Sequence, residues 1–326
     1  MDYTIKRENI DNLASYWVST KNSLHWNSLF TLPVWLKVWW REFGAGNEQY
    51  ISVISQGDDV IGIAPLLIAE EKASFISSTD VCDYLDFVIA PARDKEFFNI
   101  LFDELTNNGI KQLDLRTVRP DSTVLTSLVD ICKERSYQVF CEEENVSSEL
   151  YLPSTWEEYL GLLTKKQRHE VRRKLRRLAE AGDIKFHFVT KSDTVSALMD
   201  TFFNMFTESR QDKATFLNAS RESFFRMMTG AMADAGLLKL GVLEMNDRPL
   251  AMIICFDYND CIFLYNSAYE PSYNSLSVGL VSKILCIRES IQLGKKKFDF
   301  LNGDEPYKAR LGGVKVPLSS CRITIS

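Results

Sequence analysis

Titratable side chains gather in a short stretch near the C-terminus. Residues 298–300 alternate Phe-Asp-Phe as a β-strand would, and the polar turn 302–306 leads directly into Tyr307 and Lys308. Asp299 should point away from its two phenylalanine neighbours, and partial burial would raise its pKa. We interpret Asp299 as the best candidate base, with Asp304 and Glu305 as rivals, and Lys308 as a partner for a carboxylate or a phosphate. The competing interpretation is structural: Asp299 pairs with Lys308, and Tyr307 packs.

A serine-rich loop lies upstream of this stretch. Residues 274–280 read N-S-L-S-V-G-L, and apolar residues at helical spacing follow as far as Ile291. The N-terminus of a helix exposes unpaired N–H groups and the positive end of the helix dipole. The loop is therefore a candidate anion site next to the titratable groups. Its candidate ligand-binding residues are Ser275, Ser277, Val278, Gly279 and Leu280.

A basic block lies near the middle of the chain. The formal net charge is -6, yet residues 165–177 carry eight Lys or Arg against the single Glu170, so the rest of the chain is strongly acidic. A solvated face of a long helix would explain the block. The alternative is the capture of a polyanion by residues such as Arg168, Arg172 and Arg173. His169 lies in the block without other His or Cys at ligand spacing, which is typical of a surface residue.

The order of predicted elements indicates a duplication. The chain has 326 residues, too many for one ordinary domain, and β-β-β-α-β-α-β-β is predicted before residue 153 and a similar order after residue 182. A helix start at Ser154 or Thr155 predicts one basic linking helix over residues 153–182. We therefore predict an N-terminal domain at 1–152, this linking helix, and a C-terminal domain at 183–326. The fold class is α+β, with a twisted, mostly antiparallel sheet flanked by helices in each domain.

Cysteine usage and hydropathy bear on compartment and metals. The seven cysteines are scattered, with no C-x-x-C spacing, so we expect buried free thiols rather than disulfides or a zinc site, and we expect no metal. The first residues lack the apolar core of a signal peptide, and no run of 18 apolar residues occurs. The sequence predicts a cytoplasmic protein whose membrane contact, if any, is peripheral.

Four motifs together resemble a known family. They are L-P-V-W-L-K-V-W-W, K-K-Q-R-H-E-V-R-R-K-L-R-R-L, S-V-G-L, and F-D-F-L-N-G-D-E-P-Y-K. The combination resembles the tandem branch of the GNAT acyltransferase superfamily, which was named from cellulose-biosynthesis proteins and is related to the Fem-type aminoacyl transferases. The branch's typical Ser-Pro-Gly is Ser277-Val278-Gly279 in this chain.

The resemblance implies two GNAT-like domains with the acyl-donor site in the second. The strand end at Tyr265 and Asn266 and the loop 275–279 would hold the pyrophosphate of acyl-CoA, acetyl-CoA being the usual form. Tyr307 would be the acid for the leaving thiolate. The reaction implied is transfer of an acyl group from a thioester to an amine.

Three functions remain open at this stage. The first is an acyl-CoA-dependent N-acyltransferase acting on an amino sugar or another small amine of envelope or exopolysaccharide metabolism, including lipid-linked or nucleotide-linked sugars. The second is a Fem-like transferase that takes its acyl group from charged tRNA, with the basic helix contacting RNA. The third is a non-catalytic accessory protein of polysaccharide synthesis that binds a ligand or a synthase.

Overall fold

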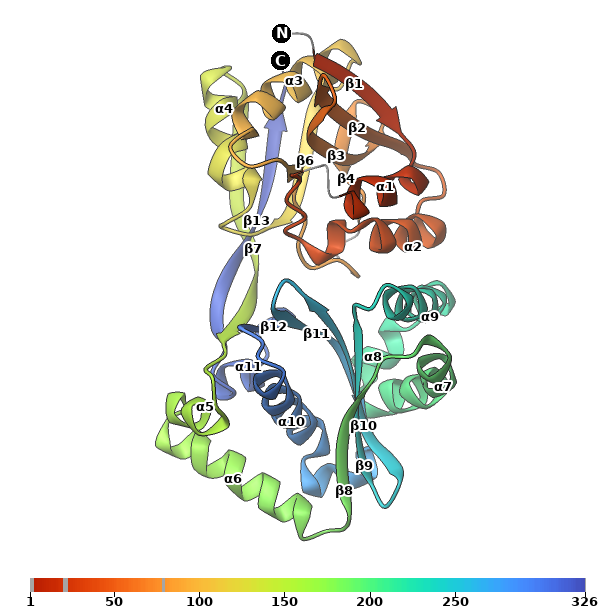
Figure 1. Ribbon diagram of the computed structural model, residues 1–326, viewed down its shortest axis with the longest axis vertical. Helices are drawn as coiled ribbons and strands as arrows, with labels where there is room; N and C mark the ends of the chain where they lie inside the picture. Colours follow the sequence, from red (N-terminus) through yellow and green to blue (C-terminus); the bar gives the residue numbers. More distant parts are fainter. Residues whose placement is uncertain (1–2, 20–22, 78–79, 326) are drawn as a thin grey trace. The chain divides into compact units, whose positions relative to one another are not determined.

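The chain folds into two compact units. The computed structural model describes residues 3–19, 23–77 and 80–325 (Figure 1). Unit 1 comprises Met1–Val146 and Val316–Ser326, and unit 2 comprises Ser147–Lys315. These units differ from the ranges expected above in two respects. The helical segment 153–182 belongs to unit 2 rather than linking two domains, and the last strand of the chain belongs to unit 1.

Unit 1 is a sheet with helices around it. Its strands run in the spatial order β1-β2-β3-β4-β6-β13, and β5 pairs with β3. The strands are β1 (Tyr3–Glu8), β2 (Glu48–Gln56), β3 (Asp59–Ala69), β4 (Lys72–Phe75), β5 (Val88–Ile89), β6 (Gln112–Val118) and β13 (Val314–Thr324). The helices are α1 (Leu13–Val18), α2 (Pro33–Phe43), α3 (Asp94–Asn107) and α4 (Val129–Glu134), the last preceded by a π-helical turn over Val124–Leu128.

The tryptophan-rich helix α2 shows how the core of unit 1 forms. Pro33 occupies its first turn, where a missing N–H costs nothing. Trp35 is fully buried and Trp39 is 3% exposed, so these rings form part of the core. The indole N–H of Trp35 is satisfied by the Sγ of Cys82, 3.2 Å away. The aromatic residues of this segment therefore serve packing.

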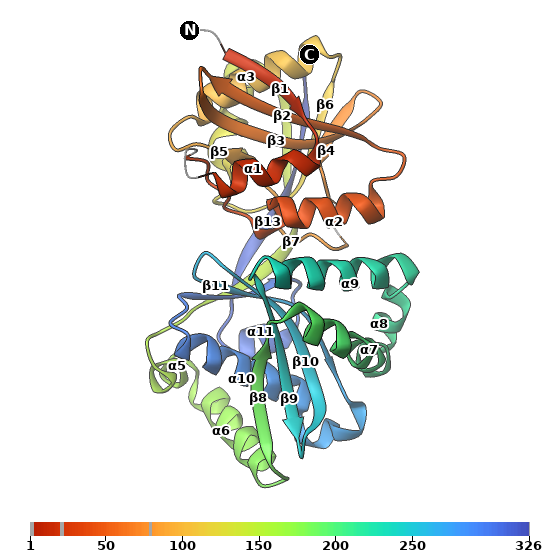
Figure 2. The ribbon, with the colours of Figure 1, turned by 45° about the vertical axis from the view of Figure 1, so that its right-hand side comes forward.

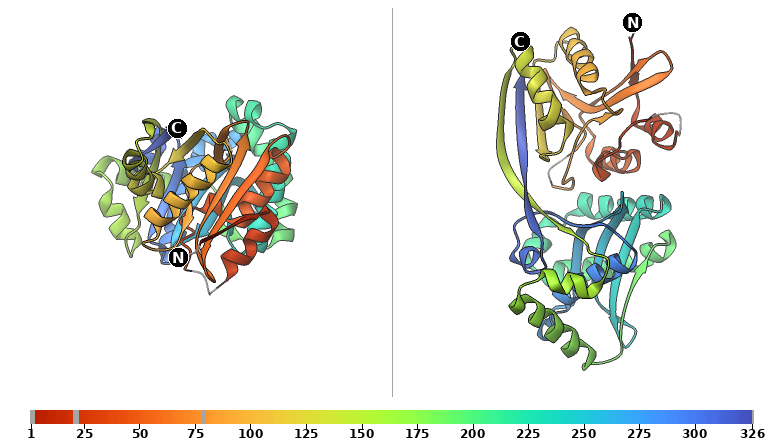
Figure 3. Two further views of the ribbon diagram at one scale, coloured as in Figure 1. Left: turned by 90° about the horizontal axis from the view of Figure 1, so that it is seen from above. Right: turned by 60° about the vertical axis from the view of Figure 1, so that its left-hand side comes forward.

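Unit 2 has helices on both faces of its sheet. The end of β7 (Gln138–Tyr151) is followed in space by β12-β11-β10-β9-β8. These strands are β8 (Ile184–Val189), β9 (Leu238–Met245), β10 (Arg248–Tyr258), β11 (Cys261–Tyr269) and β12 (Lys297–Asn302). The helices are α5 (Trp156–Leu162), α6 (Lys165–Ala179), α7 (Ser192–Ser209), α8 (Gln211–Phe216), α9 (Ala219–Asp234), α10 (Val278–Gln292) and α11 (Pro306–Arg310). Helices α7 and α9 cover one face, while α10 covers the other with α6 outside it (Figures 2 and 3).

The segment predicted as one long helix is two helices. Thr155 and Thr164 each begin a helix with a capping box, in which the threonine hydroxyl accepts from a backbone N–H and the side chain three residues later accepts from the threonine N–H. Leu163 between the two helices has extended backbone, with ψ of 148°, which ends α5. The prediction of a single helix to Gly182 was wrong because Thr164 provides a second, equally good start signal.

Two further expectations fail, one for strands and one for cysteines. The strands predicted near 137–141 and 150–152 are parts of one 14-residue strand, β7. The cysteine expectation was wrong for one pair, because Cys141 and Cys321 form a disulfide across a sequence separation of 180 residues. Cys82, Cys132, Cys255, Cys261 and Cys286 are buried free thiols, as predicted. Spacing along the chain could not reveal the disulfide because the two cysteines meet only when the last strand returns to unit 1.

Candidate functional site

Strands β11 and β12 pair at one end and separate at the other. They are parallel, and only Cys261 to Phe263 of β11 pair with Lys297 to Asp299 of β12. The remainder of β11 stays on β10, with a bulge at Tyr265, since Leu264 pairs with Cys255 and Asn266 pairs with Ile254. A parallel pair that opens in this way exposes backbone and side chains of the C-terminal half of β11. Tyr265 itself packs against Phe225 and Phe256.

The loop after β11 delivers the chain into α10. Ser277, the N-cap of α10, has left-handed backbone with φ of 56° and ψ of 37°. Gly279 has no positive φ; its glycine is required by close packing, because a Cβ there would lie 2.8 Å from the Tyr269 ring. Glycine at this position therefore provides space for the Tyr269 ring rather than a left-handed backbone. Val278 is fully buried, Leu280 is half-buried, and Ser275 is exposed.

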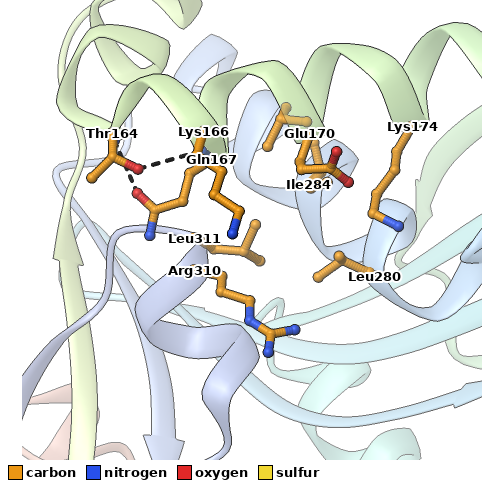
Figure 4. A pocket seen from close by; sticks show the side chains of 10 residues that line it. Thr164, Lys166, Gln167, Glu170, Lys174, Leu280, Ile284, Arg310 and Leu311 are labelled. Atoms are coloured by element: carbon orange, nitrogen blue, oxygen red, sulfur yellow. Dashed lines mark hydrogen bonds between the residues drawn. The ribbon is translucent and has the colours of Figure 1, made fainter.

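A pocket of about 550 Å³ lies between α6, the first turns of α10 and α11 (Figure 4). Its apolar lining consists of Val171, Leu280, Ile284 and Leu311. Its polar lining consists of Thr164, Lys166, Gln167, Glu170, Lys174 and Arg310. The volume is in the usual range for a small-molecule site. An apolar wall beside cationic groups suits a ligand with an apolar chain and an anionic group.

The cations of this pocket come from three elements of the chain. Lys166 and Lys174 project from α6 and Arg310 projects from α11, all toward the space beside α10 (Figure 4). The Nζ of Lys174 donates to the Oγ of Ser277 at 2.7 Å, which brings its charge to the N-terminus of α10. The one acid, Glu170, is already paired with Arg173 at 2.8 Å. Within the described ranges no carboxylate forms an ion pair with Lys166, Lys174 or Arg310.

The arginines singled out from the sequence lie outside this pocket. Arg172 pairs with Glu157 at 3.0 Å, and Arg173 pairs with Glu170. Arg168 donates to the carbonyl oxygens of Gly161 and Leu163. The pairings of Arg172 and Arg173 are those of a solvated, salt-bridged helix face, one of the two interpretations that the sequence left open. The lysines that do line the pocket belong to the same basic block.

Buried Lys283 and half-buried Lys213 meet at the open end of β11, and neither was among the residues singled out from the sequence. Lys283 of α10 donates to the Oγ of Ser267 at 3.0 Å and to the carbonyl oxygen of Gly279 at 2.8 Å. Lys213 of α8 donates to the carbonyl oxygen of the same Ser267. Lys283 interrupts an otherwise apolar helical stripe, with a side chain 7% exposed. That interruption was the one signal that could have identified it.

Both lysines have lowered pKa values. Burial, then the nearby Lys213 charge, lowers the pKa of Lys283 to about 7. Burial, then Arg210, lowers the pKa of Lys213 to about 8. Strongly shifted groups in an opening of the fold are typical of functional sites, although structural clusters also produce them. Here the two lysines with lowered pKa values contact Ser267, in the part of β11 that has separated from β12.

The candidates on α11 have mixed outcomes. Tyr307 lies with its ring centroid 5.1 Å from the Nζ of Lys283, so it joins the lysines. Burial, then Glu305, raises the pKa of Tyr307, so it keeps its proton. Lys308 donates to the carbonyl oxygens of Leu301, Asn302 and Gly303 and pairs with Glu305 at 3.0 Å. Lys308, only 2% exposed, therefore holds the turn after β12 rather than facing a ligand.

The remaining candidates serve local structure. Asp299 is fully buried, and its Oδ1 accepts from the N–H of Leu301 at 2.8 Å. It does not pair with Lys308, and a carboxyl so enclosed reaches no dissolved substrate. Asp304 is exposed and pairs with Lys315 at 2.6 Å. The Oδ1 of Asn266 accepts from the N–H of Ser267. His169 is exposed, as the sequence indicated.

A comparison with protein families identifies this part of the chain. Residues 165–309 match the sequence profile of the family described as "Acetyltransferase (GNAT) domain". Residues 165–309 are therefore similar to this GNAT family. They lie wholly within unit 2 and include the opening of β11, both lysines and every residue lining the pocket except Thr164, Arg310 and Leu311. A search of curated protein sequences finds no match.

Solved structures similar to the chain extend over both units. FemX is 11% identical, covers 98% of this chain and 96% of its own, and superposes with a TM-score of 0.68. A conserved protein of unknown function from Bacteroides thetaiotaomicron is 11% identical, covers 99% and 100%, and has a TM-score of 0.65. The C-terminal domain of a putative lysylphosphatidylglycerol synthetase from Agrobacterium fabrum is 11% identical, covers 85% and 83%, and has a TM-score of 0.56. At such identity the likeness shows a shared fold, and the chain has a tandem GNAT-type fold.

The described residues show no grouping of metal ligands and no membrane-spanning helix. Across residues 3–19, 23–77 and 80–325, His, Cys, Asp and Glu side chains do not gather in threes around a possible metal position. The same residues contain no helix with the length and apolar character needed to span a membrane.

Proposed function

We propose that the protein transfers an acyl group from a CoA thioester to an amine. The observation that carries the proposal is the pocket between α6, α10 and α11, where unpaired cations lie beside an apolar wall at the start of a GNAT helix. CoA offers phosphates and an apolar chain in one molecule. Lys166, Lys174 and Arg310 would contact the phosphates, and Leu280 and Ile284 would contact the chain.

The chain's own residues suit the steps of acyl transfer. Attack of a neutral amine on the thioester carbonyl forms the new C–N bond, and breaking the C–S bond releases a thiolate that needs a proton. Tyr307, whose raised pKa keeps its hydroxyl protonated, is the proposed donor of that proton. The amine must first lose a proton, and Glu305 is the proposed acceptor, because its side chain is 45% exposed and so reachable.

The acceptor follows from the resemblance rather than from the pocket. An amino sugar or another small amine of envelope or exopolysaccharide metabolism, free or linked to a nucleotide or lipid, is the acceptor we propose. A Fem-like transfer from charged tRNA is the second candidate, favoured by the fold shared with FemX. Against it, Arg172 and Arg173 are already paired with carboxylates, so their charges are partly neutralised and would attract RNA phosphates less strongly.

Calorimetric titration with acetyl-CoA tests the proposal. We expect binding, and we expect Lys174→Ala and Arg310→Ala each to weaken it about tenfold by removing a charge-assisted contact. Arg172→Ala is the matched control: it removes a cation from the same helix outside the pocket, and affinity should be unchanged. Failure to bind acetyl-CoA or longer acyl-CoA would refute the donor. Salt-dependent binding of charged tRNA by the same protein, lost in Lys174→Ala, would instead favour the second candidate.

A further inference from the structure

Lys213 and Lys283 enclose a small polar position on β11. Lys213 comes from α8 and Lys283 from α10, and both ammonium groups contact Ser267. Aromatic rings lie against them, since Phe206 is 4.7 Å from the Nζ of Lys213 and Tyr307 is 5.1 Å from that of Lys283. Apolar and aromatic surroundings weaken solvent screening, so charges at this position interact strongly.

No acid in the described part of the chain forms an ion pair with either lysine. The charged and titratable groups around them are Arg210, Asp212, Cys255, Cys286, Glu305 and Tyr307. Of the two acids in that set, Asp212 pairs with Arg210 at 2.7 Å and Glu305 pairs with Lys308 at 3.0 Å. Two ammonium groups therefore lie together without a counter-ion. Such a pair is unfavourable unless a proton leaves or an anion arrives.

The hydrogen-bond capacity of the pair indicates which anion fits. An ammonium group has three donors. Lys283 uses two of them, on Ser267 and Gly279, and Lys213 uses one, on Ser267. Each lysine therefore keeps at least one free N–H donor beside Ser267, and a group with two acceptor oxygens can bind both lysines. Each oxygen of a carboxylate can then accept from one lysine.

We propose that Lys213 and Lys283 bind one carboxylate group of a substrate. The site lies next to Tyr307, so this inference rests on the function proposed above and narrows it to a substrate that carries a carboxylate. The carboxylate belongs either to the acyl group of the donor, as in succinyl-CoA, or to an acceptor that carries both an amine and a carboxylate, as an amino acid does. The α6–α10–α11 pocket, with its own three cations, remains the place for phosphates.

The test compares carboxylate probes with matched neutral ones by calorimetry. Succinyl-CoA against acetyl-CoA examines the donor, and alanine against alaninamide examines the acceptor. The carboxylate member of one pair should bind at least about tenfold more tightly, and binding at pH 8 should take up protons, since the carboxylate favours charged lysines. Lys213→Met and Lys283→Met should each abolish the preference, whereas the exposed Lys185→Met should retain it.

The two proposals fail in different ways. If Lys174→Ala weakens CoA binding about tenfold while alanine binding still depends on Lys213, both proposals stand and the acceptor carries the carboxylate. If neither CoA ester binds, the donor proposal fails while the alanine pair still decides the carboxylate site. Equal binding within both probe pairs, or a preference that persists in Lys213→Met, would overturn the inference. Lys213 is partly exposed on a short helix, so its variant keeps the test valid even if Lys283→Met folds poorly.

Discussion

Replacing Lys283 by Met should change how the stability of the protein depends on pH. The side chain is 7% exposed, and its pKa is lowered to about 7 in the folded protein by burial and by Lys213. In the unfolded chain a lysine titrates near its ordinary value of about 10.4. Methionine has a similar length and volume and carries no proton at any pH. The substitution therefore removes one titration with little loss of packing.

The direction of the effect follows from which state binds the proton. Between about pH 7 and pH 10 the unfolded chain holds a proton on Lys283 that the folded protein has lost, so stability rises with pH through this window. Below pH 7 both states are protonated and the slope vanishes. From pH 7 to pH 9 the wild type should gain about 2 kcal/mol relative to Lys283→Met. At pH 7 the variant should be the more stable protein, because the buried charge opposes folding.

Urea unfolding at several pH values measures this difference. The difference in unfolding free energy between the two proteins removes the contributions of other groups, which are the same in both. Among them are Cys132, whose pKa burial raises to about 12, and Tyr159, whose pKa burial also raises; these groups make stability fall as pH rises. Two-state unfolding must hold at each pH, which coincident fluorescence and circular dichroism transitions establish. Lys185→Met serves as the control, because Lys185 is exposed.

Parallel pH profiles for the wild type and Lys283→Met would refute the reasoning. They would mean that Lys283 stays charged in the folded protein at neutral pH, with a counter-ion or solvent beside it. The pair at Ser267 would then lack the electrostatic imbalance on which the carboxylate site depends. A wild type that loses stability relative to the variant as pH rises would contradict the sign of the linkage.

Three further substitutions probe the surroundings of the site. Gly279→Ala should lower the unfolding free energy by about 1–3 kcal/mol, because the new Cβ meets the Tyr269 ring at 2.8 Å; denaturant titration measures it. Lys308→Met should cost about 2–4 kcal/mol in the same assay, because it leaves one buried and two part-buried carbonyl oxygens without their donor. An unchanged unfolding free energy would show that Lys308 does not stabilise this turn. Thr164→Ala should cost about 1 kcal/mol by removing the cap of α6, and Thr164→Ser should restore most of it.

The sequence predicts the elements of unit 2 well where periodicity is strong. The helix after Gly279 and the strands near 238, 250, 261 and 297 occur as expected, because alternation and helical stripes depend on local burial. Strand β8 was missed, although its residues alternate between half-buried and exposed from Ile184 to Phe188. The GNAT assignment is confirmed over residues 165–309, since a few motifs at the right places are enough to identify a fold family.

The chemistry of the site was harder to predict than the fold. Asp299 has the alternation expected of a base, yet its carboxylate holds the backbone of Leu301 inside the core. Lys283 is a charged residue in an otherwise apolar helical stripe. Only the tertiary structure shows that Lys213, 70 residues earlier, also contacts Ser267. Local patterns report which face a residue occupies. They do not report which distant element supplies its partner.

The contrast between the two units supports unit 2 as the location of the donor site. Each unit has a helix that joins two parallel-paired strands, α3 between β4 and β6 in unit 1 and α10 between β11 and β12 in unit 2. The first turn of α3 carries Asp94 and Glu96, whereas that of α10 carries no acid and receives Lys174.

Acids at a helix N-terminus occupy the position that an anionic ligand would take, and they repel its charge. Arg93 is the basic residue at the start of α3, and it is already paired with Glu96. The equivalent position in unit 2 has kept its positive potential for a ligand. Of the two related helices, α10 is therefore the one suited to bind phosphate.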